Sequence, residues 1–236
     1  MLKADTKRFY KSVRATDAAP FSVCLDDRPL RTPGGKLQAV PTRALAEALA
    51  AEWEAQGEKL DMASMLLTKA VNTAIDRIEP RRAEVVEELA GFAGSDLLCY
   101  RATSPRELVA RQARAWNPWL EWARSELGMD LRTGDGILHV VQPQASLDAA
   151  RSAMAAFDSF ALTALHPAIT ISGSAVLGLA FGRGLIDAAT LLNLSRIDED
   201  YQAERWGEDA EAAAVRNLRK ADLELAGRML ALLRQD

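Results

Sequence analysis

Residues 21–57 read FSVCLDDRPLRTPGGKLQAVPTRALAEALAAEWEAQG, and the spacing of the apolar residues changes from strand-like to helix-like within them. The first five residues alternate large apolar side chains with smaller or polar ones, and this period of two is typical of a half-buried β-strand. Residues 9–14 show a similar alternation, and turn-forming Asp, Pro and Gly residues follow residue 25. Together these features indicate antiparallel pairing. The sequence therefore predicts a small antiparallel β domain over residues 1–41.

The apolar residues recur every three or four positions from Thr42 onward. Thr42 is a suitable N-cap, and Leu45, Leu49 and Trp53 share one face of the helix that it would begin. Helical spacing of this kind continues, with further caps and breaks, toward the C-terminus. Residues 42–236 are therefore predicted to form a larger all-helical domain, so that the fold class of the whole chain is α+β.

Two prolines inside long helical stretches predict joints between helices. Residues 159–182 contain no formally charged side chain, and their length would suffice to span a membrane. Ten of these 24 residues are Ser, Thr, Gly, His or Pro, however, so we predict two buried helices that meet at Pro167 and no membrane insertion. Pro118 predicts a second joint, between two helices within residues 104–127.

Helix starts are marked by capping residues. Ser104 and Glu107 have the spacing of a capping box, and Ser146 and Asp187 are suitable N-caps. The helix that begins after Asp187 is expected to continue into the acidic segment that follows it. Residues 130–144 contain two glycine-containing turns next to an apolar run and are predicted to form a short hairpin or an extended link.

The composition excludes several classes of protein. The chain has 29 basic and 33 acidic residues and a formal net charge of -4, with both signs interspersed, so we expect no nucleic-acid partner. The opening MLKADTKRFYK lacks the apolar core of a secretory signal and the pattern of an organellar presequence, which favours a cytoplasmic protein or a mature form. The chain shows no heptad seam, and this favours a monomer.

Side chains suited to catalysis or metal binding are sparse. Cys24 and Cys99 lie far apart in sequence and are predicted to be free, buried thiols of an intracellular protein. His139 and His166 stand alone, and neither cysteine has a partner at metal-ligand spacing, so we predict no metal site. The glycine-rich turns lack the residues of phosphate-binding and dinucleotide-binding loops, and we predict no cofactor. Any acid or base chemistry would have to come from the acidic segment.

That segment, RIDEDYQAERWGEDAEA at residues 196–212, carries seven carboxylates around one tyrosine and one tryptophan. If residues 187–206 form one helix, Glu199, Gln202 and Trp206 lie on the same stripe as leucine side chains. A carboxylate on an apolar stripe needs a partner or a groove, because burying an unpaired charge costs several kcal/mol. We therefore expect Glu199 to have a specific role.

Three roles for Glu199 remain open at this point. It would form a structural ion pair with an arginine of this chain, act as an acid or base of raised pKa, or belong with Gln202 and Trp206 to a docking surface for another protein. The second role would make the chain a small carboxylate-dependent hydrolase or lyase that uses Glu199 with Asp198 or Tyr201, and it requires a closed pocket. A permanent structural subunit of a larger complex is a further alternative.

Six segments, in order along the chain, resemble the assembly chaperone of the α subunit of the F-type ATP synthase catalytic head, a family of mitochondria and alphaproteobacteria. The segments are VCLDDRPLRTPGG (23–35), AEWEAQGEKL (51–60), LTKAVNTAID (67–76), DLLCYR (96–101), WNPWLEWA (116–123) and LSRIDEDYQAERWGEDAEA (194–212). The most specific part is the run from Glu199 to Gly207, with its Glu, Gln, Trp and Gly spacing. Asp27 departs from the family, which has glycine at this turn.

The resemblance implies a chaperone and not an enzyme. A member of this family would bind the unassembled α subunit without using ATP, prevent its aggregation, and leave when the catalytic hexamer assembles. It would act in the bacterial cytoplasm or, in eukaryotic relatives, in the mitochondrial matrix. By position, Glu199, Gln202, Trp206 and Gly207 would contact the partner. Trp53 matches a second tryptophan of the family, although its helical neighbours favour a place in the core.

Overall fold

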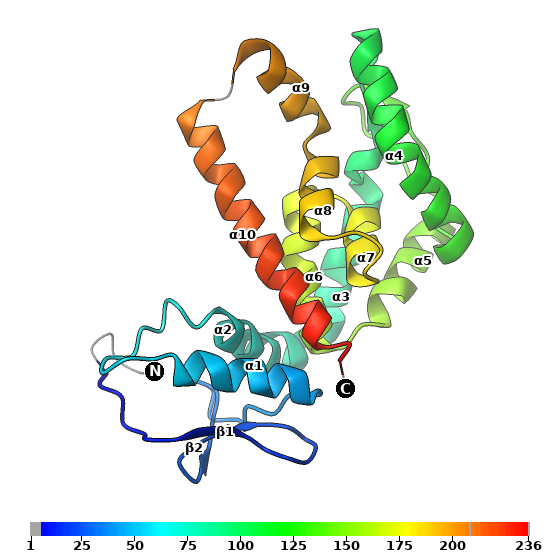
Figure 1. The fold of residues 1–236 in the computed structure, drawn as a ribbon. Coiled ribbons are helices and arrows are strands. Elements are labelled where there is room, and N and C mark those ends of the chain that lie inside the picture. Colours follow the sequence, from blue (N-terminus) through cyan, green and yellow to red (C-terminus); the bar gives the residue numbers. More distant parts are fainter. Residues whose placement is uncertain (1–5, 208, 236) are drawn as a thin grey trace. The chain divides into compact units, whose positions relative to one another are not determined.

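The computed structural model describes residues 6–207 and 209–235. The chain divides into two compact units: unit 1 comprises Met1–Arg82, Ser159–Ala164 and Arg228–Asp236, and unit 2 comprises Ala83–Asp158 and Leu165–Gly227. The predicted boundary after residue 41 lies inside unit 1, which also includes the helices that directly follow the sheet. An N-terminal antiparallel sheet followed by a mostly helical chain confirms the predicted α+β class (Figure 1).

Unit 1 contains the three-stranded antiparallel sheet. Its strands, hydrogen-bonded in sequence order, are β1 (Val13–Ala15), β2 (Val23–Leu25) and β3 (Arg28–Pro29). Asp26 follows β2 with a φ of 53°, a left-handed conformation that aspartate tolerates better than most residues. Its carboxylate accepts hydrogen bonds from the backbone N–H groups of Ser12 and Lys11, both at 3.0 Å, and these bonds hold the pKa of Asp26 below its ordinary value. The turn therefore ties β2 to the segment that precedes β1.

The helix α1 (Arg43–Glu54) packs against β1 and β2 (Figure 1). Thr42 is its N-cap, as predicted, and the Thr42 hydroxyl accepts a hydrogen bond from the backbone N–H of Leu45 at 3.3 Å. Leu45, Leu49 and Trp53 are all buried, so the predicted apolar face of this helix belongs to the core of unit 1.

The helix α2 (Leu66–Thr73) takes its N-terminal cap from the neighbouring helix. Glu52 on α1 accepts hydrogen bonds from the backbone N–H groups of Leu67 and Thr68, both at 2.8 Å. Met65, the N-cap residue of α2, supplies no side-chain hydrogen bond. One carboxylate thus satisfies two N–H groups of the first turn and fastens α2 to α1.

Replacing Glu52 with alanine is expected to lower the free energy of unfolding by about 2 kcal/mol, because two N–H groups of buried residues lose a charged acceptor. Urea denaturation followed by circular dichroism measures this difference. Glu47→Ala is the control, since Glu47 lies on the same helix and makes an exposed i,i+4 ion pair with Arg43. Equal stability of the two variants would contradict the capping role of Glu52.

The rest of the chain is mostly helical. The elements that follow α2 are a π-helical turn (Ala74–Ile78), a 3-10 turn (Glu79–Arg81), α3 (Arg82–Gly91), 3-10 turns at Phe92–Ser95 and Leu97–Cys99, β4 (Tyr100–Arg101), α4 (Arg106–Leu127), β5 (Gly134–Asp135), α5 (Gln144–Ala155), α6 (Ser159–Ser172), α7 (Ala175–Gly182), α8 (Ala188–Ser195), α9 (Ile197–Trp206) and α10 (Ala210–Leu232). Within the described residues, none of these helices combines the length and the apolar character that crossing a membrane requires.

The prolines inside α6 and α4 do not break these helices, so both predicted joints are wrong. The helix α6 continues through Pro167 and ends before Gly173, whose φ is 67°. The helix α4 continues through Pro118 to Gly128, whose φ is 72°. A proline inside a helix removes one backbone hydrogen bond and costs about 3 kcal/mol. Residues close to the proline of α6, such as Ile169, are fully buried, so packing offsets that cost.

Two predicted caps are also wrong. The N-cap of α4 is Pro105, which makes no side-chain cap, and Ser104 lies outside the helix. The helix α5 begins before Ser146, whose hydroxyl instead donates a hydrogen bond to the backbone carbonyl of Asp130 at 3.0 Å. Within residues 130–144, β5 pairs in parallel with β4, so this segment is an extended link and not a hairpin.

The helix α7 lies in the core of unit 2, and all of its residues are buried. The Ser174 hydroxyl caps it, as does a second side chain from earlier in the chain. Asp96 accepts hydrogen bonds from the backbone N–H groups of Val176 and Leu98, both at 3.0 Å, and is itself fully buried. This carboxylate therefore connects the start of α7 to the turn that precedes β4.

Candidate functional site

The acidic segment is split between two helices at Arg196. The helix α8 is capped by Asp187, whose carboxylate accepts a hydrogen bond from the backbone N–H of Thr190 at 2.7 Å, so this predicted cap is confirmed. Arg196 then has a φ of -120° and a ψ of 21°, outside the helical range, and α9 begins at the next residue. The prediction of one continuous helix over residues 187–206 is therefore wrong. Glu208 lies outside the described residues.

The break changes which face of α9 is buried. Tyr201 and Arg196 are buried, whereas Glu199, Gln202 and Trp206 are exposed, Trp206 at 77%. The prediction that Glu199 lies on a dry stripe is wrong, because that stripe was defined by leucines that belong to α8. Within α9 alone the three exposed residues follow at intervals of three and four, which places them in one row along the helix. We call Glu199, Gln202 and Trp206 the exposed row.

Hydrogen bonds fasten the opposite side of α9 to α4. The buried side chain of Gln112 donates from Nε2 to the carboxylate of Asp198 at 2.6 Å, and its Oε1 accepts from the backbone N–H of Ala102 at 2.8 Å. Trp116, also on α4, donates from Nε1 to the backbone carbonyl of Leu194 at 2.8 Å. Together these bonds hold the end of α8 and the start of α9 against α4.

Two ion pairs and an aromatic ring continue this attachment toward the end of α9. The guanidinium of Arg111 donates two hydrogen bonds, of 2.7 and 2.8 Å, to the carboxylate of Glu204 and holds the pKa of Glu204 below its ordinary value. Arg205 pairs with Glu107 at 2.6 Å. Both arginines also lie over the buried ring of Tyr201, at 4.0 Å for Arg205 and 5.4 Å for Arg111. Exposed pairs stabilise little individually, but this network fixes the orientation of α9.

The other two predicted contact residues have different surroundings. Gly207 ends α9 beside Trp206 with a φ of 83°, where a side chain would be strained, and its N–H donates to the carbonyl of Ala203 at 2.9 Å. Trp53 is 4% exposed and packs edge-to-face on Tyr10, with ring centroids 5.7 Å apart. Trp53 therefore belongs to the core of unit 1, and we leave it out of the candidate surface.

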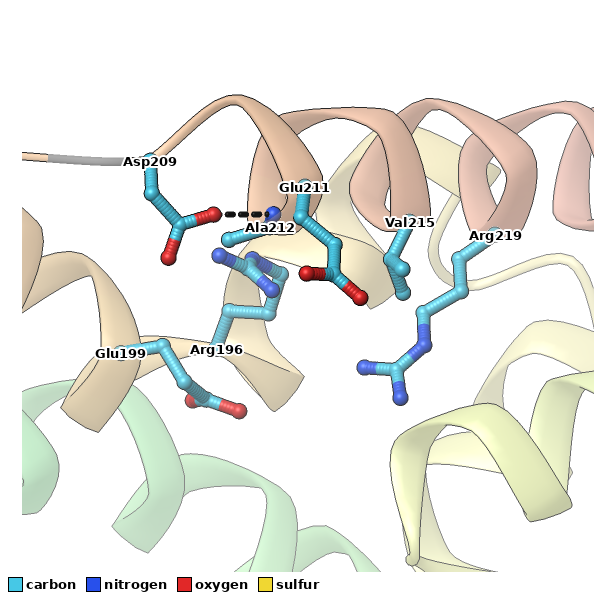
Figure 2. Close-up of a pocket in the computed structure, with 7 residues that line it drawn as sticks. All are labelled: Arg196, Glu199, Asp209, Glu211, Ala212, Val215 and Arg219. Carbon is cyan, nitrogen blue, oxygen red and sulfur yellow. Dashed lines mark hydrogen bonds between the residues drawn. The ribbon is translucent and has the colours of Figure 1, made fainter.

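An open pocket lies beside the exposed row, between α9 and the first turns of α10 (Figure 2). Its lining residues are Arg196, Glu199, Asp209, Glu211, Ala212, Val215 and Arg219. Figure 2 shows the carboxylates of Glu199 and Glu211 and the guanidinium of Arg219 directed toward the same space. Asp209 accepts a hydrogen bond from the backbone N–H of Ala212 at 2.7 Å and so caps α10. The exposed row thus borders a hollow that presents both signs of charge.

This geometry separates the roles considered for Glu199. In the part of the chain that the structure describes, Glu199 forms no ion pair, so the structural pair with an arginine is not supported. The hydrolase or lyase alternative requires a closed pocket, whereas Glu199 is exposed at an open one. The docking role requires accessible polar and aromatic side chains, and the exposed row provides them.

The described part of the chain contains no candidate metal site. Across residues 6–207 and 209–235, no three His, Cys, Asp or Glu side chains are placed to hold a metal ion. Cys24 and Cys99 are free and buried, as predicted. Burial raises the pKa of Cys99 to about 12, so its thiol stays protonated near neutral pH.

The sequence alone does not identify the residues on α4 that position α9. Glu107 and Arg111 have i,i+4 spacing, and the sequence pattern places Glu107 in a predicted capping box. Arg111 lies 93 positions from its partner Glu204, and Gln112 lies 86 positions from Asp198. No pattern within one sequence connects residues so far apart.

Comparison with known proteins gives a consistent set of relatives. A family model described as ATP12 chaperone protein matches residues 7–124. The mitochondrial protein atp12 of Schizosaccharomyces pombe is 25% identical over 224 residues, which cover 89% of this chain and 77% of that protein.

Solved structures agree with this chain over nearly its whole length. Atp12 from Paracoccus denitrificans, known both in its crystal structure and as a mutant, is 44% identical with a TM-score of 0.93, covering 97% of this chain and 98% of that one. A proposed chaperone from Agrobacterium tumefaciens is 41% identical with a TM-score of 0.89, covering 97% and 86%. The chain therefore belongs to the ATP12 chaperone protein family.

Proposed function

We propose that this protein is an ATP-independent chaperone that binds the unassembled α subunit of the F-type ATP synthase and prevents its aggregation until the catalytic hexamer assembles. The observation that carries the proposal is the exposed row on α9. Trp206 is 77% exposed and lies in one row with a glutamate and a glutamine. An exposed tryptophan beside polar side chains is typical of a binding surface in the absence of its partner.

The attachment of α9 to α4 supports a binding role for the exposed row. Arg111 and Gln112 hold Glu204 and Asp198 on the inner side of α9, so the outer side keeps its orientation without a partner. A surface that is already ordered loses less conformational entropy on binding, and this favours affinity. The ordered attachment of α9 therefore supports a docking role for the exposed row.

The polar character of the exposed row also suits a partner that must later be released. An unassembled subunit of a hetero-oligomer exposes apolar surface and tends to aggregate. A chaperone that covered it with a wholly apolar seam would hold it permanently, whereas a charged and aromatic patch gives moderate affinity. Glu199 remains hydrated while the protein is free, and it would pair with a cationic side chain of the partner.

The relatives are consistent with this proposal and with the cellular compartment that we propose for the protein. They include a mitochondrial protein of a fungus and proteins of two bacteria, and the family is described as a chaperone. We propose that this protein acts in the bacterial cytoplasm and that eukaryotic relatives act in the mitochondrial matrix. We also propose that the free protein is a monomer and requires no cofactor.

Glu199→Lys and Trp206→Ala are each expected to weaken binding of the purified, unassembled α subunit by about thirtyfold, because truncating or reversing an interface anchor costs about 2 kcal/mol or more. Isothermal titration calorimetry gives the affinity, and light scattering of the α subunit at its aggregation temperature gives the protective effect. Glu126→Lys is the matched control, since Glu126 is an exposed glutamate on α4 and the charge change is the same.

Two results would overturn the proposal. In the first, the wild-type protein neither binds the α subunit nor delays its aggregation. In the second, both variants on α9 keep their folded structure and bind as tightly as Glu126→Lys.

A further inference from the structure

A second exposed feature of unit 2 is the segment GILHVV at residues 136–141, between β5 and α5, which we call the apolar loop. Ile137, Leu138 and Val141 are 96%, 79% and 71% exposed. Scattered apolar side chains on a surface need no explanation, but three strongly exposed ones within five residues are an unusual concentration. Such a patch in a folded protein indicates a site of interaction.

The base of the apolar loop is held by specific hydrogen bonds. Gln142 is buried, and its side chain accepts from the backbone N–H of Arg132 at 2.8 Å and donates to the carbonyl of Arg132 at 2.9 Å. Gly136 donates to the backbone carbonyl of Arg101 at 2.8 Å. At Gly134 a Cβ atom would lie 2.5 Å from Val140, so the two ends of the loop approach closely. The chain thus closes the loop with its polar groups and leaves the large apolar side chains outside.

The apolar loop and the exposed row lie on elements attached to the same part of α4. The loop is bonded to Arg101, and the adjacent Ala102 donates its N–H to Gln112 Oε1 at 2.8 Å. The Nε2 of the same Gln112 donates to Asp198 on α9 at 2.6 Å. The buried side chain of Gln112 therefore links the residue after β4 to α9, and β4 is the strand that pairs with β5 before the loop.

We infer that the apolar loop is a second contact for the same partner and takes an apolar patch of the unassembled α subunit while the exposed row makes the polar contacts. This inference rests on the proposed function. Gln112 bonds both to Asp198 on α9 and to Ala102, next to the residue that holds the loop, and this proximity favours one partner over two. The loop contains no lysine or arginine, and its nearest charged neighbour along the chain is Asp135, so charge does not favour an anionic lipid surface.

The test is a double variant, Ile137→Ser with Leu138→Ser, titrated with the purified α subunit beside Trp206→Ala. Each buried apolar side chain contributes about a factor of ten to affinity, so the loss of both is expected to weaken binding by about a hundredfold while the melting temperature stays unchanged. Leu185→Ser is the matched control, because Leu185 is an exposed leucine in another loop of unit 2 and is 52% exposed. It is expected to change affinity by less than about twofold.

The outcomes separate this inference from the proposed function. If the double variant binds like the wild type while Trp206→Ala loses binding, the inference is overturned and the proposed function stands. If the wild type does not bind the α subunit, the proposed function fails and the inference fails with it. Co-flotation of the wild type, but not of the double variant, with phosphatidylglycerol vesicles would assign the loop to lipid. A wild-type dimer that the double variant converts to a monomer would assign it to a second copy of the chain, and either result would overturn the inference.

Discussion

Replacing Asp96 with alanine is expected to lower the free energy of unfolding by about 3 kcal/mol. Asp96 is fully buried, and its two carboxylate oxygens accept hydrogen bonds from the backbone N–H groups of Leu98 and Val176, both at 3.0 Å. Alanine leaves both N–H groups buried without this acceptor, which costs about 1 to 3 kcal/mol for each group. Part of this loss is offset, because the variant no longer buries a carboxylate charge. Urea denaturation followed by circular dichroism measures the difference.

The same carboxyl group makes stability depend on pH. Burial raises the pKa of Asp96 to about 6, and the hydrogen bonds from Val176, Leu98 and Ser174 offset only part of this effect. Since the folded-state pKa lies above the ordinary value of 3.8, the folded state binds the proton more tightly than the unfolded state between these values. The contribution of Asp96 to stability is therefore greatest below pH 3.8 and is lost as the pH rises through about 6, by about 3 kcal/mol in total.

Asp96→Asn separates the hydrogen bonds from the ionisation. Asparagine keeps one acceptor oxygen and does not titrate, so this variant is expected to be more stable than Asp96→Ala. The stability of the wild type relative to Asp96→Asn should increase as the pH falls from about 7 to about 5.

Asp26→Asn is the control for pH, because the backbone hydrogen bonds from Ser12 and Lys11 lower the pKa of Asp26. The stability that comes from Asp26 is present above its unfolded pKa and is lost as the pH falls through its folded pKa, the opposite trend. A difference between wild type and Asp96→Asn that does not change with pH would contradict the raised pKa of Asp96.

The features that the sequence predicted correctly depend on neighbours along the chain. The alternation before Asp26 specifies a strand, and Thr42 and Asp187 accept hydrogen bonds from N–H groups three residues later. Gly128 ends α4 because glycine adopts a positive φ without strain. Each of these signals lies within one turn of the structure that it specifies, so no tertiary information is needed to interpret it.

The features that the sequence did not predict depend on packing between distant segments. Pro118 and Pro167 would end isolated helices, but the surrounding tertiary contacts keep α4 and α6 continuous. Asp96 accepts a hydrogen bond from the backbone N–H of Val176, in the first turn of α7 and 80 positions later in the chain. Its partners could not be found without knowing how the segments pack.

The candidate surface depends partly on spacing along the chain and partly on packing between distant segments. Glu199, Gln202 and Trp206 share a row in any helix, and this part of the prediction depended only on spacing. Whether the row faces the core or the solvent depended on the break at Arg196, which no cap or proline marks. The sequence therefore identified which residues belong together, whereas the structure was needed to show that they are exposed.

Replacing Gly178 with alanine is expected to destabilise the fold by about 3 kcal/mol, although alanine is the better helix former. A Cβ atom at Gly178 would lie 2.2 Å from Cγ1 and 3.0 Å from Cδ1 of Ile169 on α6. Ile169 is fully buried, and so is every residue of α7, so neither side has free space into which to move. The methyl group would therefore force α6 and α7 apart or push Ile169 out of its preferred rotamer.

Gly91→Ala is the matched control for this prediction. A Cβ atom at Gly91 meets nothing within 4 Å, and the residue has helical φ and ψ values of -56° and -28°. This variant is expected to gain up to about 1 kcal/mol from helix propensity. Because both variants add the same methyl group, the difference between their unfolding free energies isolates the contact between α6 and α7. Ile169→Ala should lower the free energy of unfolding by less in the Gly178→Ala background than in the wild type, because it removes the clashing atoms. Additive effects of the two substitutions would contradict the close approach of α6 and α7.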